Sequence, residues 1–252
     1  MSIAVGVPLL ECIYIVACGR YLCKRWLMAG YKDSKEWPLA SVEDFEPIPR
    51  MCRMILAVYE NDLNNPKWPP QGGYKMDCSS LVKKVGYDDT SGRCPPYLIY
   101  VDHTAKDIVL AVRGLNLIKE KDYSVLLNND LGKEPYDNGY VHHGLLKAAM
   151  WLLNEERDTL RRLVMENPSY TLSFAGHSLG SGVVALLSVL VAKDRNSIGN
   201  IAREKIRCYC IAPARCMSLN LALLYADIIH SVILQVRSLP SFILFSQLFI
   251  FN

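Results

Sequence analysis

Apolar and polar residues in the central part of the chain repeat with two different periods. Leu98–Val101 and Ile108–Val112 are short apolar runs rich in β-forming residues, and the polar residues 102–106 between them predict a hairpin of two strands. Between residues 143 and 166, apolar side chains recur at steps of three and four with charged side chains between them, which predicts a long amphipathic helix. Pro168 marks the end of this helix.

Further along the chain, short apolar runs alternate with helical segments. Residues 181–192 are so apolar that the helix they predict must be covered on most sides. The other predicted elements are a strand at 170–175, a strand at 206–211, a helix at 218–227 and a strand at 230–234. Strands that alternate with helices at these lengths predict an α/β fold with a mainly parallel sheet and helices on both faces.

The sequence divides into three parts. Residues 1–90 predict an N-terminal extension of helices and loops, in which prolines are frequent and residues 51–59 form one amphipathic helix. Residues 91–240 contain the predicted sheet and its helices. Residues 241–252 are an apolar tail, which is too short to span a bilayer.

The N-terminal extension begins with an apolar stretch at residues 3–18 that contains one acidic residue, Glu11. Its basic residues, Arg20, Lys24 and Arg25, follow the apolar stretch instead of preceding it, which argues against a secretory signal. The stretch is also short for a membrane span. Two interpretations stay open: a helix that packs on the protein's own core and a helix that lies on a membrane surface.

Composition sets limits on function without indicating one. The chain has 252 residues and a net charge of +3, and its lysines and arginines form no long stripe, so no nucleic-acid partner is expected. Nine scattered cysteines without zinc-type spacing predict reduced thiols of an intracellular protein, either cytoplasmic or peripheral on a membrane. The histidines are not paired with cysteines or acids at ligand spacing, so no metal is expected.

The segment Gly176-His177-Ser178-Leu179-Gly180 joins a predicted strand to a predicted helix. By itself the pattern G-x-S-x-G is weak, but in this context it indicates a nucleophile elbow. A serine at the tip of such a turn has strained dihedral angles, so only small residues fit two positions before it and two after it. The turn exposes the serine hydroxyl at the carboxyl end of the sheet, where the N–H groups of the next helix face developing negative charge. This arrangement suits acyl transfer.

The segment YTLSFAGHSLGSGVVALLSVL, the upstream VLAVRGL and VHHGLL and the downstream IAPARC resemble the class 3 lipases. This α/β-hydrolase family includes fungal triacylglycerol lipases and sn1-diacylglycerol lipases. The segment FEPIPRMCRMILAVYE resembles a plant branch whose members are described as calmodulin-binding or heat-shock-related lipases. The resemblance extends to about Gln235 and implies an α/β-hydrolase fold, a lipid or acyl-ester substrate and no cofactor.

The resemblance also implies roles for individual residues. Ser178 matches the family's nucleophile and Leu179 a backbone donor of its oxyanion hole. The second donor follows an Arg-Gly pair, which places it at Leu115, where many members carry a serine or threonine whose hydroxyl adds a further hydrogen bond. An oxyanion hole that lacks one donor loses roughly 10²–10³ in rate. His142 and His143 match a V-H-x-G turn and are expected to shape the pocket, since the triad order of this fold is Ser, acid, His.

The chain offers no match for the family's triad acid and base. The acid is expected after the strand 231–235, in a segment resembling Q-D-D-x-L-P-R, but residues 236–240 read VRSLP, and no histidine follows Pro240. Asp227 and His230 come at the start of the last strand, from where they cannot easily reach Ser178. We therefore expect a C-terminally truncated family member, with a fold incomplete at its C-terminus and weak or no activity. A natural divergent terminus stays an alternative.

Two other functions stay open beside a serine lipid hydrolase. The chain could be a non-catalytic lipid-binding protein that keeps the apolar pocket. It could also be a calmodulin target, because residues 12–28 combine apolar anchors with three basic residues, a pattern typical of such targets. An ordinary docked helix explains the same pattern.

Overall fold

The computed structural model describes residues 16–22, 40–115, 125, 134–238 and 244–251. The chain divides into two compact units, Met1–Leu39 and Ala40–Asn252. In the first unit residues 16–22 are helical, and the rest of the apolar stretch and of the predicted calmodulin segment lies outside the described residues. No helix in the described ranges combines the length and the apolar character that crossing a bilayer requires.

The second unit is built on a seven-stranded sheet with the strand order β1-β2-β3-β6-β7-β8-β9. Strands β3, β6, β7 and β8 are parallel to one another, whereas β1, β2 and β9 pair antiparallel at the two edges. The strands are β1 (Leu81–Val85), β2 (Tyr97–Asp102), β3 (Asp107–Val112), β6 (Thr171–His177), β7 (Ile206–Ile211), β8 (Ile229–Ser238) and β9 (Leu244–Phe251). Strands β4 (Glu134–Tyr136) and β5 (Gly139–Val141) form a separate hairpin.

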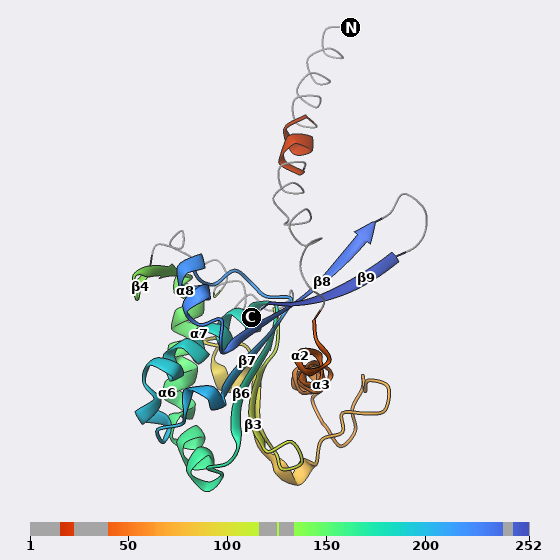
Figure 1. The fold of residues 1–252 in the computed structure, drawn as a ribbon. Helices are drawn as coiled ribbons and strands as arrows, with labels where there is room; N and C mark the ends of the chain where they lie inside the picture. The colour runs from red at the N-terminus through yellow and green to blue at the C-terminus, as the bar shows by residue number, and fades with distance from the viewer. Residues whose placement is uncertain (1–15, 23–39, 116–124, 126–133, 239–243, 252) are drawn as a thin grey trace, which may run out of the picture. The chain divides into compact units, whose positions relative to one another are not determined.

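Helices cover both faces of the sheet, with α6, α7 and α8 on one side and α2 and α3 on the other (Figure 1). The α-helices are α2 (Val42–Phe45), α3 (Pro47–Tyr59), α4 (Tyr87–Thr90), α6 (His143–Glu166), α7 (Leu179–Lys193) and α8 (Leu219–Leu224). Short 3₁₀ turns lie at Cys78–Ser80, Arg195–Ile198 and Arg203–Lys205. The predicted α/β architecture with a mainly parallel sheet is confirmed.

Strand residues alternate between two cores, as the pleat requires. Ile99, Leu110 and Phe174 are buried on the α6–α7 side, whereas Val109 and Ala175 are buried on the α3 side. All the residues of α7 from Leu179 to Val189 are buried, in agreement with the prediction that this helix is covered on most sides. The two cores fix the register of the central strands, because a slip of one residue would exchange their faces.

The element boundaries differ from the sequence expectation in three places. Helix α3 begins at Pro47 instead of residue 51, since proline fits the first turn of a helix. Strand β1 joins the sheet, so residues from Ala40 onward share one unit with it, whereas the sequence suggested a boundary at residue 90. A β-bulge between Leu81 and Lys83 breaks the alternation by which β1 could have been recognised. The apolar tail contains β9, which pairs with β8 from Ser231 to Ser238.

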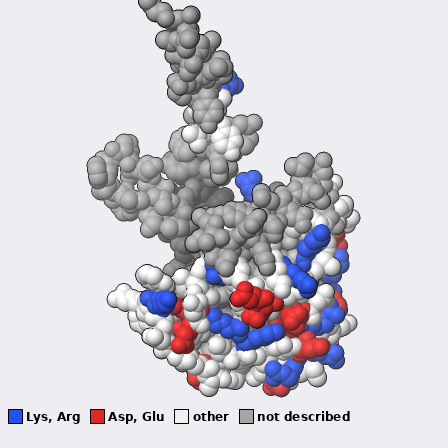
Figure 2. Space-filling model, turned by 180° about the vertical axis from the view of Figure 1, so that it is seen from behind, with Lys and Arg blue, Asp and Glu red and all other residues white. Residues whose placement is uncertain are grey.

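Charged side chains of both signs are interspersed on the face of the protein shown in Figure 2. Several of them tie elements together: Arg50 of α3 lies 2.7 Å from the buried Asp107 at the start of β3, and Lys83 of β1 lies 2.6 Å from the buried Glu156 of α6. Glu156 also accepts a hydrogen bond from the hydroxyl of Tyr97. These contacts hold the helices on the sheet.

Candidate active site

Ser178 lies at the turn between β6 and α7, at the carboxyl edge of the parallel strands. Its backbone has φ 51° and ψ −116°, which is a strained conformation for a residue other than glycine. Its N–H donates a hydrogen bond of 3.0 Å to the carbonyl of Ile211 on β7, and the residue is half-buried. The structure therefore gives Ser178 the strained backbone geometry of a serine at a sharp strand-to-helix turn, and its role as nucleophile stays a prediction.

Two glycines make this turn sterically feasible. A Cβ atom at Gly176 would lie 2.5 Å from the carbonyl oxygen of Gly180 and 2.7 Å from the nitrogen of Ser181. A Cβ atom at Gly180 would collide with the carbonyl oxygen of Arg113 and would lie 2.7 Å from that of Val112, at the end of β3. The predicted support roles of these glycines thus have a direct cause, which is close packing of backbone against backbone.

Ser181 is a support of the turn that sequence reasoning missed. Its hydroxyl donates to the carbonyl oxygen of Ser178 and accepts a 3.0 Å hydrogen bond from the N–H of Ala214, in the loop after β7. Its own N–H donates to the same Ser178 carbonyl at 3.1 Å. Ser181 is fully buried and links two loops at the carboxyl edge. Its place directly after the G-x-S-x-G pattern is the only signal that the sequence offers for it.

The two predicted oxyanion donors lie at the same edge of the sheet as Ser178. Leu179 is the first residue of α7, a helix of 15 residues whose N-terminal N–H groups carry partial positive charge. Leu115 follows Arg113-Gly114 just after β3, and β3 runs parallel to β6 with Val112 opposite Gly176. The side chain of Leu115 is half-buried against the α6–α7 core. It offers a backbone N–H and no hydroxyl, and its role as an oxyanion donor stays a prediction.

The Arg113-Gly114 turn is held by a residue of helix α3. The hydroxyl oxygen of Tyr59 accepts a 2.8 Å hydrogen bond from the N–H of Gly114 and lies 3.4 Å from Nδ1 of His177. The guanidinium of Arg113 lies over the ring of Tyr59 at 4.6 Å and over the ring of Tyr87 at 4.9 Å. A groove of about 620 Å³ opens beside these three side chains. Tyr59 was not identified from the sequence, where it only ends the amphipathic run MCRMILAVY.

His177 precedes the nucleophile, and its ring faces α3. Burial lowers the pKa of the His177 side chain below its ordinary value of 6.5. The folded protein therefore binds a proton at this site only at a lower pH than the unfolded chain does. The stability that the neutral ring contributes is fully present above about pH 6.5 and is lost as the pH falls through the lowered pKa.

We expect the free energy of unfolding to fall between pH 7 and pH 5.5, and to fall less in His177→Gln, because glutamine does not titrate. Urea unfolding at the two pH values measures both differences. Equal pH dependence in the wild type and the variant would show that His177 is not responsible.

His142 and His143 lie at the start of α6. The ring of His142 caps this helix by accepting a 3.3 Å hydrogen bond from the N–H of Leu145, and its backbone N–H donates to the carbonyl of Cys216 at 2.8 Å. The start of α6 also packs on the start of α7, because a Cβ atom at Gly182 would lie 2.7 Å from Leu145. His142 is buried, and His143 is half-buried. Their role in shaping a pocket stays a prediction.

Among the described residues, the geometry assigns no triad acid or base to Ser178. Asp227 makes two hydrogen bonds of 2.7 and 2.8 Å to Arg203, and these hold the pKa of its carboxyl below the ordinary range although burial opposes them. The ring of His230 stacks on Tyr209 at 5.3 Å. Asp194 ends α7, at the opposite end of that helix from Ser178.

An apolar pocket of about 500 Å³ lies beside the elbow. It is bounded by α7, the loop after β7, α8 and β8, and it contains Ser181 and Ala214, which are hydrogen-bonded to each other next to Ser178. Its apolar lining includes Ala185, Pro213, Met217, Leu219, Ala222, Leu223, Ala226, Ile229 and Ile233. Its volume lies in the ordinary range for small-molecule sites, about 300–1,000 Å³.

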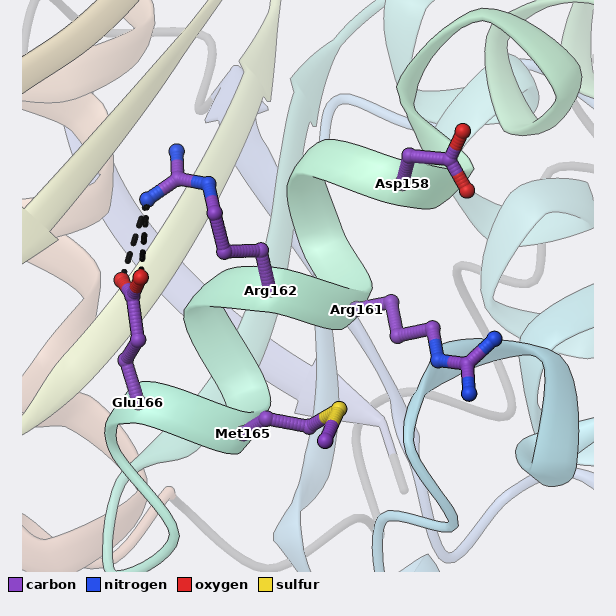
Figure 3. Close-up of a pocket in the computed structure, with 5 residues that line it drawn as sticks. All are labelled: Asp158, Arg161, Arg162, Met165 and Glu166. Carbon is purple, nitrogen blue, oxygen red and sulfur yellow. Dashed lines mark hydrogen bonds and ion pairs between the residues drawn. The ribbon is translucent and has the colours of Figure 1, made fainter.

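A second hollow lies at the C-terminal end of α6 and is formed by one helix face. Figure 3 shows its five residues, Asp158, Arg161, Arg162, Met165 and Glu166, projecting from successive turns of that helix. Arg162 and Glu166 form an exposed ion pair of 3.0 Å. The end of α6 leads into the start of β6, so this hollow lies at the opposite edge of the sheet from Ser178. None of its five side chains is a serine, threonine or cysteine nucleophile, and we interpret it as a solvent-exposed helix face.

Solved structures with a similar fold are fungal lipases. A fungal lipase studied in complex with an inhibitor superposes with a TM-score of 0.58 at 16% identity, over 74% of this chain and 68% of that chain. The triacylglyceride lipase of Rhizomucor miehei gives a TM-score of 0.56 at 16% identity, over 76% and 71%. The lipase of Rhizopus microsporus var. chinensis gives 0.57 at 15% identity, over 83% and 79%. The fold is therefore that of the α/β-hydrolases.

Sequence comparison identifies the family. Diacylglycerol lipase-beta of Mus musculus is 29% identical over 153 residues, which are 58% of this chain and 21% of that protein, so the chain spans about a fifth of the length of this relative. A model of the N-terminal region of lipase 3 matches residues 9–76, and the model described as Lipase (class 3) matches residues 109–242, more than half of the chain. The chain belongs to the class 3 lipase family.

Proposed function

We propose that this protein is a serine hydrolase of lipid carboxylic esters, of the triacylglycerol or diacylglycerol type. The observation that carries the proposal is Ser178, held at φ 51° at the head of α7 beside the Arg113-Gly114 turn. The hydroxyl of Ser178 attacks the ester carbonyl, and the backbone N–H groups of Leu179 and Leu115 bind the resulting oxyanion. The bond to the alcohol then breaks and leaves an acyl-enzyme, which water hydrolyses.

The described residues assign no base to the proposed reaction. A serine hydroxyl without a base has a pKa far above neutral and attacks slowly, and an oxyanion hole alone retains roughly 10³–10⁴-fold acceleration over water. We therefore propose that this form of the protein has weak activity or none. The proposed oxyanion hole also supports weak activity, because Leu115 offers only its backbone N–H and no side-chain hydroxyl.

The lipid character of the substrate is supported by the apolar pocket beside Ser178. Alanine, leucine and isoleucine side chains from α7, α8 and β8 line it, and each methylene group transferred into such surroundings gains about 0.8 kcal/mol. The names of the similar proteins, a diacylglycerol lipase and a triacylglyceride lipase, support an acylglycerol. An intracellular location, cytoplasmic or peripheral on a membrane, is part of the same proposal.

A fluorophosphonate probe tests this function, because it reacts only with a serine that the site activates. Labelling of the wild type that is lost in Ser178→Ala and kept in Ser197→Ala, a substitution of a half-buried serine after α7, supports it. A folded wild-type protein that is not labelled overturns catalysis by this chain.

A non-catalytic lipid-binding protein is the second candidate. It is favoured by the combination of an apolar pocket beside the turn with hydrogen bonding of Asp227 to Arg203 instead of to the site. Its signature is saturable binding of a fatty acid that Ser178→Ala leaves unchanged, without ester turnover. Loss of binding in that variant would contradict it.

We also retain calmodulin as a proposed partner through residues 12–28. The described part of this segment, residues 16–22, is helical, as calmodulin targets are when bound. A calcium-dependent gel shift with a peptide of residues 10–30 tests the proposal, and a peptide in which Arg20, Lys24 and Arg25 are replaced by glutamate is the matched control. No shift with the native peptide would refute it.

A further inference from the structure

Tyr59 connects three parts of the proposed active site that are far apart in the sequence. It is the last residue of α3, and its hydroxyl oxygen lies 2.8 Å from the nitrogen of Gly114 and 3.4 Å from Nδ1 of His177. Gly114 directly precedes the donor Leu115, and His177 directly precedes the nucleophile Ser178. The hydroxyl group of Tyr59 thus contacts the residue before the proposed oxyanion donor and the residue before the proposed nucleophile.

A side chain at position 114 would crowd its neighbours. A Cβ atom there would lie 2.7 Å from Nδ1 of His177, 2.9 Å from the hydroxyl of Tyr59 and 3.1 Å from the carbonyl oxygen of His177. Glycine allows this close approach, but it also allows a wide range of backbone angles. The direction of the Leu115 N–H depends on the φ and ψ angles of Gly114, since the two amides flank the same Cα atom. Without an external contact, the donor would be poorly oriented.

The hydroxyl of Tyr59 supplies that contact, and the tyrosine is itself held in place. Its ring lies under the guanidinium of Arg113 at 4.6 Å, and the same guanidinium lies 4.9 Å from the ring centre of Tyr87. The backbone N–H of Arg113 donates to the carbonyl of Pro96 at 3.1 Å. The Arg-Gly turn is therefore fixed from the strand side by Pro96 and from the helix side by Tyr59.

We propose that Tyr59 is a positioning residue of the oxyanion hole: by binding the Gly114 N–H it orients the Leu115 N–H toward the oxyanion formed at Ser178. The proposal rests on the proposed ester hydrolysis for its effect on rate, but not for its effect on the Gly114 backbone. Tyr59 lies in the segment that matches the N-terminal region, whereas Gly114 and Ser178 lie in the segment that matches the class 3 lipase. The N-terminal region thereby contributes to the site itself.

Tyr59→Phe tests the proposal, because it removes one oxygen atom and keeps the ring under Arg113. We expect the maximal rate constant of fluorophosphonate labelling at Ser178 to fall roughly tenfold or more, the size of an impaired oxyanion donor. The probe concentration at half-maximal rate should stay unchanged, since the donor acts on the transition state. Hydrogen exchange of the Gly114 amide should become at least about tenfold faster, whereas exchange of Val109 within β3 should not change.

The matched control is Tyr100→Phe. The hydroxyl of Tyr100 also accepts a hydrogen bond from a backbone N–H, that of Asp77 at 3.0 Å, and it lies on the same face of the sheet away from Ser178. Normal labelling in this variant supports a specific role of Tyr59, and equal slowing in both variants overturns it. If the wild type is not labelled at all, the proposed ester hydrolysis fails, and hydrogen exchange of the Gly114 amide then tests the role of Tyr59 by itself. Unchanged exchange in Tyr59→Phe overturns that role, and faster exchange supports it.

Discussion

Gly180→Ala is expected to destabilise the fold by about 4 kcal/mol, which is at the upper end for a single substitution. The added methyl group would collide with the carbonyl oxygen of Arg113 and lie 2.7 Å from that of Val112. Both are backbone atoms of β3 and the turn after it, so no side-chain rotation relieves the overlap. The added methyl group forces the first turn of α7 or the end of β3 to move. Both are packed in the core on the α6–α7 side of the sheet.

Thermal unfolding followed by circular dichroism measures this effect, and a loss of about 4 kcal/mol corresponds to a decrease in Tm of roughly 10 °C for a domain of this size. Gly86→Ala is the control, because the nearest atom to its added methyl group would be a side-chain oxygen of Asp89 at 3.6 Å and its φ is −92°. We expect a loss of at most about 1 kcal/mol there, because Gly86 is the N-cap of α4 and alanine is less favourable than glycine at that position. A similar loss in both variants would contradict the steric explanation.

The sequence predicted the elements whose side-chain pattern is set by burial. The hairpin of β2 and β3, helix α6 and strand β7 are confirmed because their apolar residues face one of two cores with the expected period. Strand β1 lacks such a pattern, since it is a bulged edge strand that carries Lys83 and Lys84. Edge strands bury fewer side chains, and their sequence is correspondingly less informative.

The parts of the site that escaped prediction depend on contacts between distant segments. Tyr59 is 55 residues from Gly114 and 118 from His177, and Ser181 is 33 residues from Ala214. Hydrogen bonds to backbone groups leave no periodic signal, so only the folded structure brings them together. The Leu115 donor came from the family resemblance and stays a prediction, which is consistent with the register: β3 and β6 are parallel neighbours, and their ends meet at one edge.

Leu115→Ser is expected to accelerate labelling of Ser178 by fluorophosphonate roughly tenfold to a hundredfold. The substitution adds a hydroxyl beside the Leu115 N–H, and one oxyanion donor is worth roughly 10²–10³ in rate when its orientation is good. The gain is smaller than the maximum because a serine side chain rotates and has to be ordered. The half-buried leucine packs against the α6–α7 core, so the variant should lose about 2 kcal/mol of stability.

Leu115→Ala separates the effect on labelling rate from the effect on stability, because it removes the same apolar contacts and adds no hydrogen-bond donor. We expect a similar loss of stability in Leu115→Ala and a labelling rate no higher than that of the wild type. If the alanine variant is accelerated as much as the serine variant, a wider pocket explains the gain and the missing hydroxyl does not. If neither is accelerated while Ser178 is labelled, position 115 does not face the oxyanion, and the second donor has to be sought elsewhere at the carboxyl edge of the sheet.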